Sequence, residues 1–515
     1  MKSVLLFLTL FFISSVQAQK LSFKIDNQKD TTVHLIKYFG KKLFYADTAE
    51  LKKGKVEFDG SKQVAGILGV LLPGQKYFEF IYNNEDISIE TSLPDMVGSM
   101  KVLKSAENKV FIPYIRFISS QKKKVNQMGA ERAKLDKEEP RYKTLTKSME
   151  IINKKVKKYQ DDLIEEHKSK LVSKIVRMSM DVDIPESPKD VNGNIIDSSF
   201  SFRYYRDHYW DNVDLTDDAL VNNPVFHNKL EYYFGQNMMI QHWDTVLYYA
   251  FPFCDELNPK SKMFEYCVGW ITSSYGKSKI MGMDKVYLEM LNRYYCTENT
   301  EGESPAFWVT EDKFEDLCDN IQNKLKLTVG SVPPNLILRD TTDKNWKDFY
   351  SLNAEYTILY FWDPDCGHCK KTTPKLETLY QKKFKDRNVE IFSVGKAIGE
   401  DFEKWKKFIH DNKLSYINVA VTDNLYNEAQ DTTEGQPKLM KVLRNTTLES
   451  LNYQNTFDIF STPKVFVLDK DKKIIAKSIS ISQLEDLIDR LQGKEDLPKL
   501  FPPDPEEDAQ MQKKE

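Results

Sequence analysis

Residues 359–371 read LYFWDPDCGHCKK, and this stretch decides the fold of the last third of the chain. Its first four residues are apolar or aromatic, which predicts a buried strand. The Asp-Pro-Asp that follows favours a turn. Two cysteines separated by two residues, Cys366 and Cys369, come directly after the turn, where we expect a helix to begin. The stretch is therefore interpreted as strand, turn and helix, with both thiols at the helix N-terminus.

This placement suits thiol chemistry. The reactive form of cysteine is the thiolate, and the unpaired N–H groups and positive dipole at a helix N-terminus favour that anion. We expect Cys366, at the exposed start of the helix, to attack disulfides and Cys369, one turn further in, to resolve the mixed disulfide. Gly367 and His368 lie between them and are expected to tune the pair.

The imidazole of His368 would stabilise the Cys366 thiolate, lower the thiol pKa and make the disulfide more oxidising. This holds only if the ring points towards the sulfur, and the alternative is an exposed loop residue without a chemical role.

A metal site and a structural disulfide are weaker interpretations of the cysteine pair. A zinc site needs a second pair of ligands at comparable spacing, and the sequence has neither another C-x-x-C nor an H-x-x-x-H, so we expect no metal. A purely structural disulfide across so short a loop would add little stability by chain entropy. The redox interpretation is preferred, and no cofactor is expected beyond the Cys366–Cys369 disulfide itself.

The sequence around the pair predicts an α/β domain over residues 329–494. A Val-Pro-Pro-Asn segment at 332–335 marks its entry. The strand-like runs are residues 357–362, 389–394, 417–421, 464–468 and 474–477, and the helical patterns are residues 373–384, 401–410 and 482–491.

Two further domains are predicted upstream. Short alternating blocks separated by Asn, Asp and Gly turns predict a small antiparallel β domain over residues 19–104. Apolar residues at helical spacing within Lys/Glu-rich segments predict a mainly helical domain over residues 105–328. The many aromatic residues between 200 and 320 are expected to pack its core rather than to bind a ligand.

The two ends of the chain predict export and disorder. Met1-Lys2, an apolar run from Val4 to Ile13 and small residues up to Ala18 predict a signal peptide over residues 1–18. No other run approaches the roughly 20 apolar residues that a membrane span needs, so we expect none after cleavage. The Pro- and charge-rich residues 495–515 are expected to be disordered.

The charge composition gives no indication of a nucleic-acid partner. The 74 basic and 77 acidic residues nearly cancel, to a net charge of -3, which gives no electrostatic footprint for nucleic acid.

The remaining cysteines are Cys254, Cys267, Cys296 and Cys318. They allow three pairings, and buried free thiols are slightly preferred over disulfides.

The cysteine block resembles the active site of thioredoxin-like proteins, specifically the exported TlpA/ResA-like branch. Thr462-Pro463, which stands directly before the apolar run at 464–468, is similar to the cis-proline loop of that family. The resemblance implies that Thr462, Pro463 and Trp362 form a substrate groove beside the dithiol. The upstream arrangement resembles that of multidomain envelope thioredoxins from Bacteroidetes-type bacteria.

The sequence departs from the family at both usual proton acceptors. Tyr360 stands where thioredoxin has a buried Asp, and Thr372 stands where ResA-like proteins often have a Glu. Asp363, Asp365 or a water are the candidate replacements. The Cys-Gly-His-Cys sequence also resembles that of protein disulfide isomerases, and the reduction potentials of isomerase and thioredoxin differ by about 90 mV, roughly 4 kcal/mol. The direction of electron flow therefore stays open.

The resulting prediction is an exported thiol–disulfide oxidoreductase of the periplasm or cell envelope of a Gram-negative bacterium. It acts on protein thiols and disulfides, as a reductant fed by a membrane or envelope electron donor. A disulfide oxidase or isomerase is the first alternative. The second is a partner-binding envelope protein whose dithiol is vestigial.

Overall fold

The computed structural model describes residues 19–298, 302–430 and 438–505. The predicted signal peptide and the last ten residues of the predicted tail lie outside these ranges. The chain forms two compact units. Within the described ranges, one unit comprises residues 19–240 with 252–267, and the other comprises residues 241–251 with the described residues from 268 to 505. The helices predicted as one domain over residues 105–328 are thus shared between the two units.

Strands of the first unit form two four-stranded sheets within the described residues, in the orders β4-β1-β7-β8 and β3-β2-β5-β6. Their bounds are β1 Lys20–Asp26, β2 Thr31–Phe39, β3 Lys42–Leu51, β4 Lys55–Asp59, β5 Gly66–Leu72, β6 Lys76–Tyr82, β7 Ile87–Ser92 and β8 Lys101–Lys104. The prediction of a wholly antiparallel domain is wrong in one pair, because β1 and β7 run parallel. Alternation of apolar and polar residues reports that a strand has one buried face, not the direction of its neighbour.

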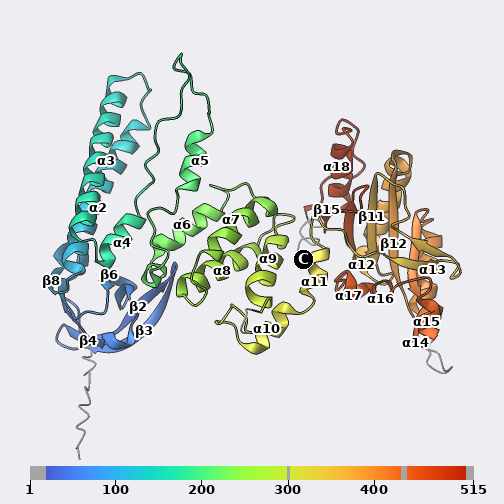
Figure 1. Cartoon of the computed structure of the whole chain (residues 1–515), viewed down its shortest axis with the longest axis horizontal. Coiled ribbons are helices and arrows are strands. Elements are labelled where there is room, and N and C mark those ends of the chain that lie inside the picture. Colours follow the sequence, from blue (N-terminus) through green and yellow to red (C-terminus); the bar gives the residue numbers. More distant parts are fainter. Residues whose placement is uncertain (1–18, 299–301, 431–437, 506–515) are drawn as a thin grey trace, which may run out of the picture. The chain divides into compact units, whose positions relative to one another are not determined.

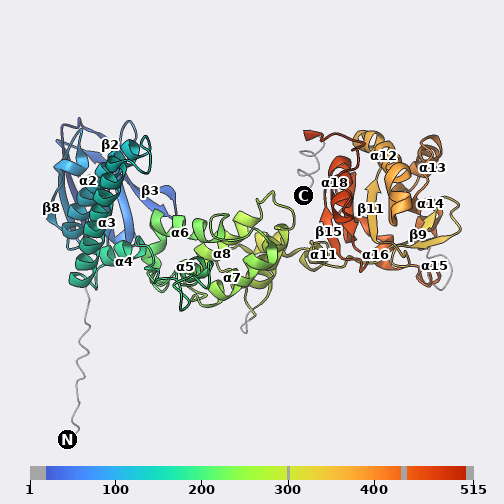
Figure 2. The ribbon, with the colours of Figure 1, turned by 90° about the horizontal axis from the view of Figure 1, so that it is seen from above.

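Helices follow the strands in the chain order that the sequence predicts. Their bounds are α1 Met96–Ser99, α2 Asn108–Arg132, α3 Pro140–Glu166, α4 Leu171–Met178, α5 Phe200–Asp207, α6 Pro224–Phe234, α7 Trp243–Asp255 and α8 Lys262–Tyr275. Short 3-10 turns lie at Gly60–Lys62 and Asp218–Val221. Helices α2 and α3 run side by side as a long hairpin (Figures 1 and 2). Helix α6 begins where Asn223 caps Val225 and Pro224 takes the first position, as that residue pair favours.

Aromatic side chains form part of the helical core of the first unit, as predicted. The Trp210 ring packs against Phe253, Tyr233 and Phe226, with ring centroids 4.8, 5.3 and 6.1 Å away. Cys254 and Cys267 are fully buried free thiols, as expected.

The prediction of free thiols is wrong for Cys296 and Cys318, which form a disulfide with their Cα atoms 5.5 Å apart. Cys318 ends α10, and Cys296 ends a π-helical turn. Sequence spacing alone does not bring two cysteines 22 residues apart together, and this contact depends on how the helices pack.

The second unit contains the later helices and the C-terminal α/β domain, whose helices cover a central sheet (Figure 2). A seven-stranded sheet has the order β10-β9-β13-β12-β11-β14-β15 over the described part of the chain. The strands are β9 Ile337–Asp340, β10 Trp346–Asp348, β11 Tyr356–Trp362, β12 Val389–Ala397, β13 Ile417–Thr422, β14 Lys464–Leu468 and β15 Ile474–Lys477. The helices are α9 Asp284–Leu291, α10 Glu311–Cys318, α11 Ile321–Lys326, α12 Gly367–Leu379, α13 Asp401–Asp411, α14 Asp423–Gln430, α15 Lys438–Val442, α16 Leu448–Leu451, α17 Tyr453–Thr456 and α18 Ile481–Leu491. Shorter turns are the π-helical segments Asn292–Cys296 and Tyr380–Phe384 and a 3-10 turn at Lys385–Arg387.

The five strands predicted for this domain are confirmed, as β11 to β15. Strand β11 lies between β12, to which it is parallel, and β14, to which it is antiparallel. Its residues alternate between two buried apolar clusters, one containing Ile358 and Tyr360 and the other Leu359 and Phe361. A strand buried on both faces has a continuous apolar sequence, which is why it was recognisable. The short strands β9 and β10 were not predicted.

The prediction of a disordered tail is wrong for its first part, around Leu500 and Phe501. Leu500 and Phe501 pack against the core cluster that contains Ile488. Their backbone N–H groups donate to the buried Glu485 carboxylate over 2.8 to 3.1 Å, and Lys499 pairs with Asp489 at 3.0 Å. Proline and charge content predicts disorder on average, but buried carboxylates supply specific partners for this segment.

Candidate active site

Cys366 lies at the junction that the sequence predicts. Strand β11 ends at Trp362, and the Cys366 N–H donates to the Asp363 carbonyl over 3.1 Å, which closes the turn. Cys366 is the N-cap of α12, and its sulfur accepts from the Cys369 N–H at 3.4 Å. The thiol therefore satisfies one of the free N–H groups of the first helical turn.

A second segment reaches the dithiol from the other side of β11. Strand β14 pairs antiparallel with β11, with Lys464 opposite Phe361, and this register places the preceding loop beside the turn. The Cys366 thiol donates to the Thr462 carbonyl oxygen over 3.4 Å. The Thr462–Pro463 peptide bond is cis. Thr462 and Pro463, predicted from the sequence, thus lie at the site.

The two thiols have opposite electrostatic environments. Partial burial would raise the pKa of Cys366, but hydrogen bonds with the Thr462 side chain and with the backbone N–H groups of Cys369 and His368 outweigh it, and the pKa is lowered. Burial raises the pKa of Cys369 to about 12, against smaller effects of Asp363 and Thr462 that lower it. Cys366 is therefore the thiol that forms a thiolate, and Cys369 is protected from solvent.

Gly367 and His368 lie between the cysteines, and their tuning role stays a prediction. Both are exposed, and no hydrogen bond or ion pair joins the His368 ring to any residue that the structure describes. His368 acts on Cys366 through its backbone N–H. A Cβ atom added at Gly367 would meet nothing within 4 Å, so glycine is not required there by space.

The expectation that Trp362 forms part of a substrate groove is not supported by its position. The side chain is 1% exposed, its indole N–H donates to the Ser393 hydroxyl over 2.8 Å, and its ring packs 5.0 Å from Phe408. It is the last residue of β11, and the helix that follows β12 covers it. Trp362 is a core residue that positions the end of the strand below the dithiol.

The positions of the usual acids are occupied by neutral groups. Tyr360 is fully buried, and its hydroxyl lies 2.8 Å from that of Thr373. Thr372 donates to the His368 carbonyl. Of the two carboxylates that were candidates for the proton acceptor, Asp365 is exposed, and its hydrogen bond with Lys404 lowers its pKa. Asp363 is less exposed, lies 3.5 Å from Lys396, and its backbone is hydrogen-bonded to Cys369.

Two residues near the site, Lys464 and Phe460, were not predicted from the sequence. Lys464 follows Pro463 inside an apolar strand, and its buried amine donates to the Asp458 carbonyl over 2.7 Å. This contact ties the start of β14 to the loop before Pro463. Phe460, in that loop, is 86% exposed. The sequence offered two signals for these residues. One is a lysine within an otherwise apolar strand, and the other is an aromatic residue three positions before Pro463.

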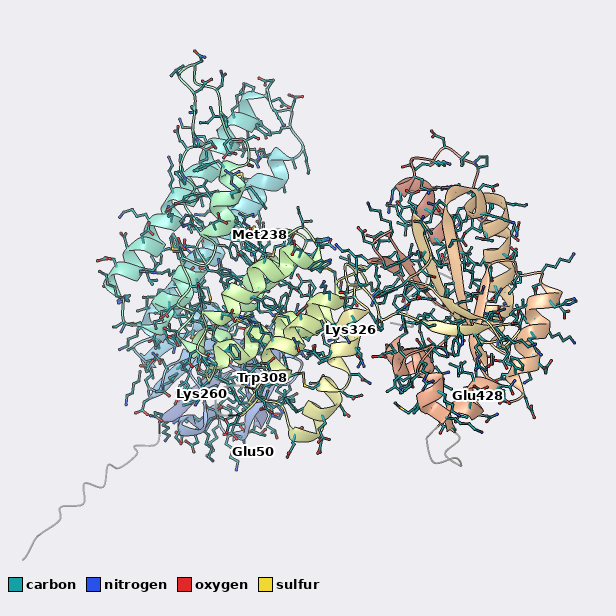
Figure 3. All side chains as sticks on the ribbon, turned by 45° about the vertical axis from the view of Figure 1, so that its right-hand side comes forward. Glu50, Met238, Lys260, Trp308, Lys326 and Glu428 are labelled. Atoms are coloured by element: carbon teal, nitrogen blue, oxygen red, sulfur yellow. A yellow bond between two sulfur atoms is a disulfide. The ribbon has the colours of Figure 1, made fainter. Side chains whose placement is uncertain are left out.

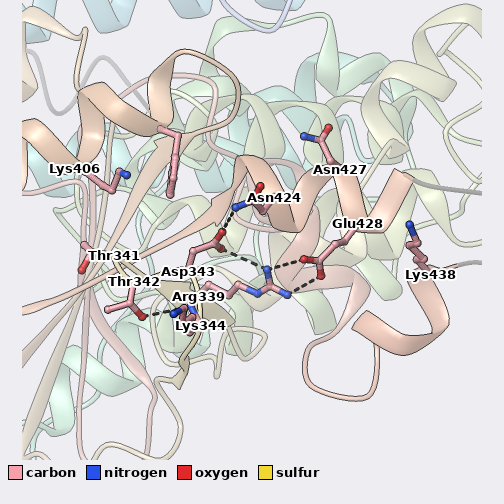
Figure 4. Close-up of a pocket in the computed structure, with 11 residues that line it drawn as sticks. Arg339, Thr341, Thr342, Asp343, Lys344, Lys406, Asn424, Asn427, Glu428 and Lys438 are labelled. Carbon is pink, nitrogen blue, oxygen red and sulfur yellow. Dashed lines mark hydrogen bonds and ion pairs between the residues drawn. The ribbon is translucent and has the colours of Figure 1, made fainter.

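A polar pocket of about 570 Å³ lies elsewhere in the domain and does not include the cysteines (Figure 4). Arg339 forms two hydrogen bonds with Glu428, at 3.1 and 2.7 Å, and one with Asp343 at 3.4 Å. The central charges of the pocket are therefore paired with each other. They join β9 to α14, where Glu428 lies (Figure 3), and we assign them a structural role.

Residues 353–474 match the family model described as thioredoxin-like. The C-terminal domain belongs to the thioredoxin-like family. A second family model, described as a domain of unknown function (DUF4369), matches residues 20–111, which contain the two sheets of the first unit.

Curated relatives of the thioredoxin-like domain are thiol–disulfide oxidoreductases. The ResA protein of Bacillus cereus is 25% identical over 170 residues, which is 33% of this chain and 80% of the relative. The ResA protein of Bacillus anthracis is 25% identical over 165 residues, or 32% and 78% of the two chains.

Two solved structures are similar to parts of the chain. A domain of a possible thiol-disulfide isomerase from Cytophaga hutchinsonii is 31% identical, covering 32% of this chain and 95% of that one, with a TM-score of 0.25. A thioredoxin-like protein from Bacteroides caccae is 16% identical, covering 59% and 97%, with a TM-score of 0.38.

Proposed function

We propose that this protein is an exported thiol–disulfide oxidoreductase that reduces disulfide bonds in protein substrates through Cys366 and Cys369. The observation that carries the proposal is the contrast between the two thiols. Cys366 is partly exposed at a helix N-terminus with a lowered pKa, whereas its neighbour in the motif is buried with a pKa of about 12. An exposed nucleophile beside a protected resolving thiol is what two-step disulfide exchange requires.

The proposed reaction has two displacements. The Cys366 thiolate attacks one sulfur of the substrate disulfide, which forms a mixed disulfide and releases the other substrate sulfur as a thiolate that takes up a proton. Cys369 then loses its proton and attacks the Cys366 sulfur, which releases the second substrate thiol and forms the Cys366–Cys369 disulfide. The substrate gains two electrons and two protons. A dithiol or other two-electron donor of the envelope must return them, and no separate cofactor is proposed.

Deprotonation of Cys369 is the step that needs help, because its pKa lies far above neutral pH. We assign the proton to the Asp363 carboxylate, directly or through a water. Asp363 is the less exposed of the two candidate carboxylates, and its own backbone contacts Cys369. Tyr360 and Thr372, which occupy the places of the usual acids, are neutral.

The surroundings of the dithiol favour a polypeptide substrate. The Thr462 backbone adjoins Cys366, and the exposed Phe460 ring lies only two residues away in the chain. Two residues span at most about 7 Å, so both groups can reach one extended chain. Pro463 shapes the same loop.

The alternative is a disulfide oxidase or isomerase, and one observation favours it. Stabilising the Cys366 thiolate stabilises the reduced pair, and a pair whose reduced form is stabilised is a stronger oxidant. The lowered pKa of Cys366 acts in this direction.

Export to the periplasm or cell envelope is part of the proposal. It is supported by the signal-like first 18 residues and by the resemblance to exported family members. Across the ranges that the structure covers, no helix combines the length and apolar character needed to cross a membrane.

The deciding experiment is the equilibrium reduction potential of the Cys366/Cys369 pair in the mature protein. Cys254 and Cys267 are replaced by alanine, and the redox state is read by mass spectrometry of the peptide that contains the motif, after titration against glutathione or dithiothreitol. A potential near about -270 mV supports the reductant, and one near about -180 mV supports the oxidase or isomerase. A pair that does not form a disulfide reversibly would overturn both.

A further inference from the structure

The α2–α3 hairpin concentrates positive charge to a degree that no other property of the chain explains. Helices α2 and α3 with the turn between them, residues 108–166, contain 15 Lys or Arg against 9 Asp or Glu, whereas the whole chain has 74 against 77. The hairpin therefore carries a net charge of +6 on a protein whose net charge is -3. The two helices and the turn between them run as a hairpin (Figure 1).

Three lysines of α3 lie on one face together with Ile151. Lys147, Ile151, Lys154 and Lys158 are spaced by four, three and four residues, which places them in a single stripe along about 16 Å of helix. Leu145, which is buried, points to the opposite side. The stripe faces solvent.

Five lysines of the hairpin form no ion pair within the described ranges, although Glu150 lies four residues before Lys154. No hydrogen bond or ion pair connects Lys122, Lys123, Lys124, Lys147 or Lys154 to any residue in the described ranges. A merely solvated helix face usually pairs its lysines with acids four residues away, as Lys158 does with Asp162 at 3.0 Å. The five lysines are all exposed.

An apolar side chain lies within the stripe. Ile151 is 59% exposed between Lys147 and Lys154, one helical turn from each. Isolated exposed apolar residues are common, but one flanked on the same helix face by two unpaired lysines also suits a helix that lies on a lipid surface. The aliphatic part of lysine can follow the apolar side chain into the interface while the amine stays among the headgroups.

We infer that the α2–α3 hairpin binds an anionic phospholipid surface. Each basic residue near such a surface contributes attraction that falls off within a Debye length. Nucleic acid fits less well, because all five unpaired basic residues are lysines, which lack the planar fork of arginine, and because Ile151 would have no partner there. The interaction would keep a protein without a described spanning helix next to a membrane. It does not rest on the proposed redox function.

The test is co-sedimentation of the full mature protein with vesicles of phosphatidylcholine alone or mixed with phosphatidylglycerol. The variant K122Q/K123Q/K124Q/K147Q/K154Q removes the unpaired charges and keeps good helix formers. The control variant K29Q/K42Q/K52Q/K53Q/K76Q changes the net charge equally, at exposed lysines of the β strands and turns. Circular dichroism verifies that both variants are folded.

We expect the wild type and the control to bind the anionic vesicles, and the hairpin variant to bind at least roughly ten-fold more weakly. I151S should weaken binding while leaving its salt dependence unchanged. Equal binding to neutral and anionic vesicles, equal loss in the control variant, or no vesicle binding by the wild type while it binds duplex DNA would each overturn the inference.

Discussion

Cys366 and Cys267 are both free cysteines, yet their surroundings give them opposite chemistry. Cys267 lies inside α8, fully buried, and burial together with the nearby Cys254 raises its pKa well above the ordinary value. Cys366 lies at the start of α12, where backbone N–H groups and Thr462 lower its pKa. Position along a helix, rather than residue type, separates a structural thiol from a nucleophile.

The largest effect should come from removing the nucleophile. Cys366→Ser should reduce the rate of insulin disulfide reduction to the uncatalysed rate, because serine cannot form a disulfide. Cys254→Ala is the matched control and should retain the wild-type rate per folded molecule. Full activity in Cys366→Ser would contradict the proposed function.

The rate of alkylation should distinguish Cys366 from the other thiols almost as clearly. Iodoacetamide should modify Cys366 with a pH midpoint below about 8.5, the value of an ordinary cysteine. Cys369, with a pKa of about 12, and the buried Cys254 and Cys267 should react only after unfolding. Mass spectrometry of each cysteine peptide across a pH series measures the order in which the cysteines react. Labelling of Cys267 before Cys366 in the folded protein would contradict the difference between the two thiols.

The Cys296–Cys318 disulfide should contribute to stability and not to exchange. It closes a loop across a sequence separation of 22, for which the chain-entropy model gives about 3 kcal/mol. The Cys296→Ser/Cys318→Ser variant should lose about that much free energy of unfolding in denaturant titrations. Its insulin reduction rate, measured where it is folded, should match the wild type.

Trp362→Phe tests whether this side chain belongs to the core or to a substrate groove. Loss of the indole N–H leaves the buried Ser393 hydroxyl without its donor, which should cost about 1–3 kcal/mol of stability. The KM for a peptide substrate should not change. An increase in KM without a loss of stability would show that Trp362 forms part of the substrate groove.

The smallest expected effect is that of Thr462→Val. The change removes the hydroxyl that hydrogen-bonds Cys366, so the pKa of Cys366 should rise towards its ordinary value. At pH below that value, less thiolate is present and the alkylation rate should fall. Thr447→Val, at a helix N-cap of the same domain, is the control. An unchanged alkylation profile in Thr462→Val would show that the Thr462 hydroxyl does not lower the pKa of Cys366.

Much of the thioredoxin-like domain and its dithiol could be predicted because local signals and tertiary structure agree there. A continuous apolar run, a turn and a C-x-x-C motif define β11 and α12 without long-range information. Thr462 and Pro463 were placed through resemblance to the family, since 96 residues separate Thr462 from Cys366. The buried environment of Trp362 depends on α13, which lies further along the chain.

The predictions that failed depended on packing between distant elements. The parallel pairing of β1 with β7 and the Cys296–Cys318 disulfide leave no periodic signal in the sequence. The tuning role of His368 stays a prediction, because spacing places an imidazole near a thiol but does not orient it.

Glu485 carries a practical consequence for anyone who isolates the thioredoxin-like domain. Its carboxylate is fully buried on α18 and is held by Lys383 at 2.5 Å and by the backbone of Leu500 and Phe501. A domain cut at the end of α18, at Leu491, would lose Leu500 and Phe501 and would leave the buried Glu485 carboxylate without their backbone N–H donors. Expression boundaries should therefore extend to residue 505, so that the domain keeps the segment that closes its own core.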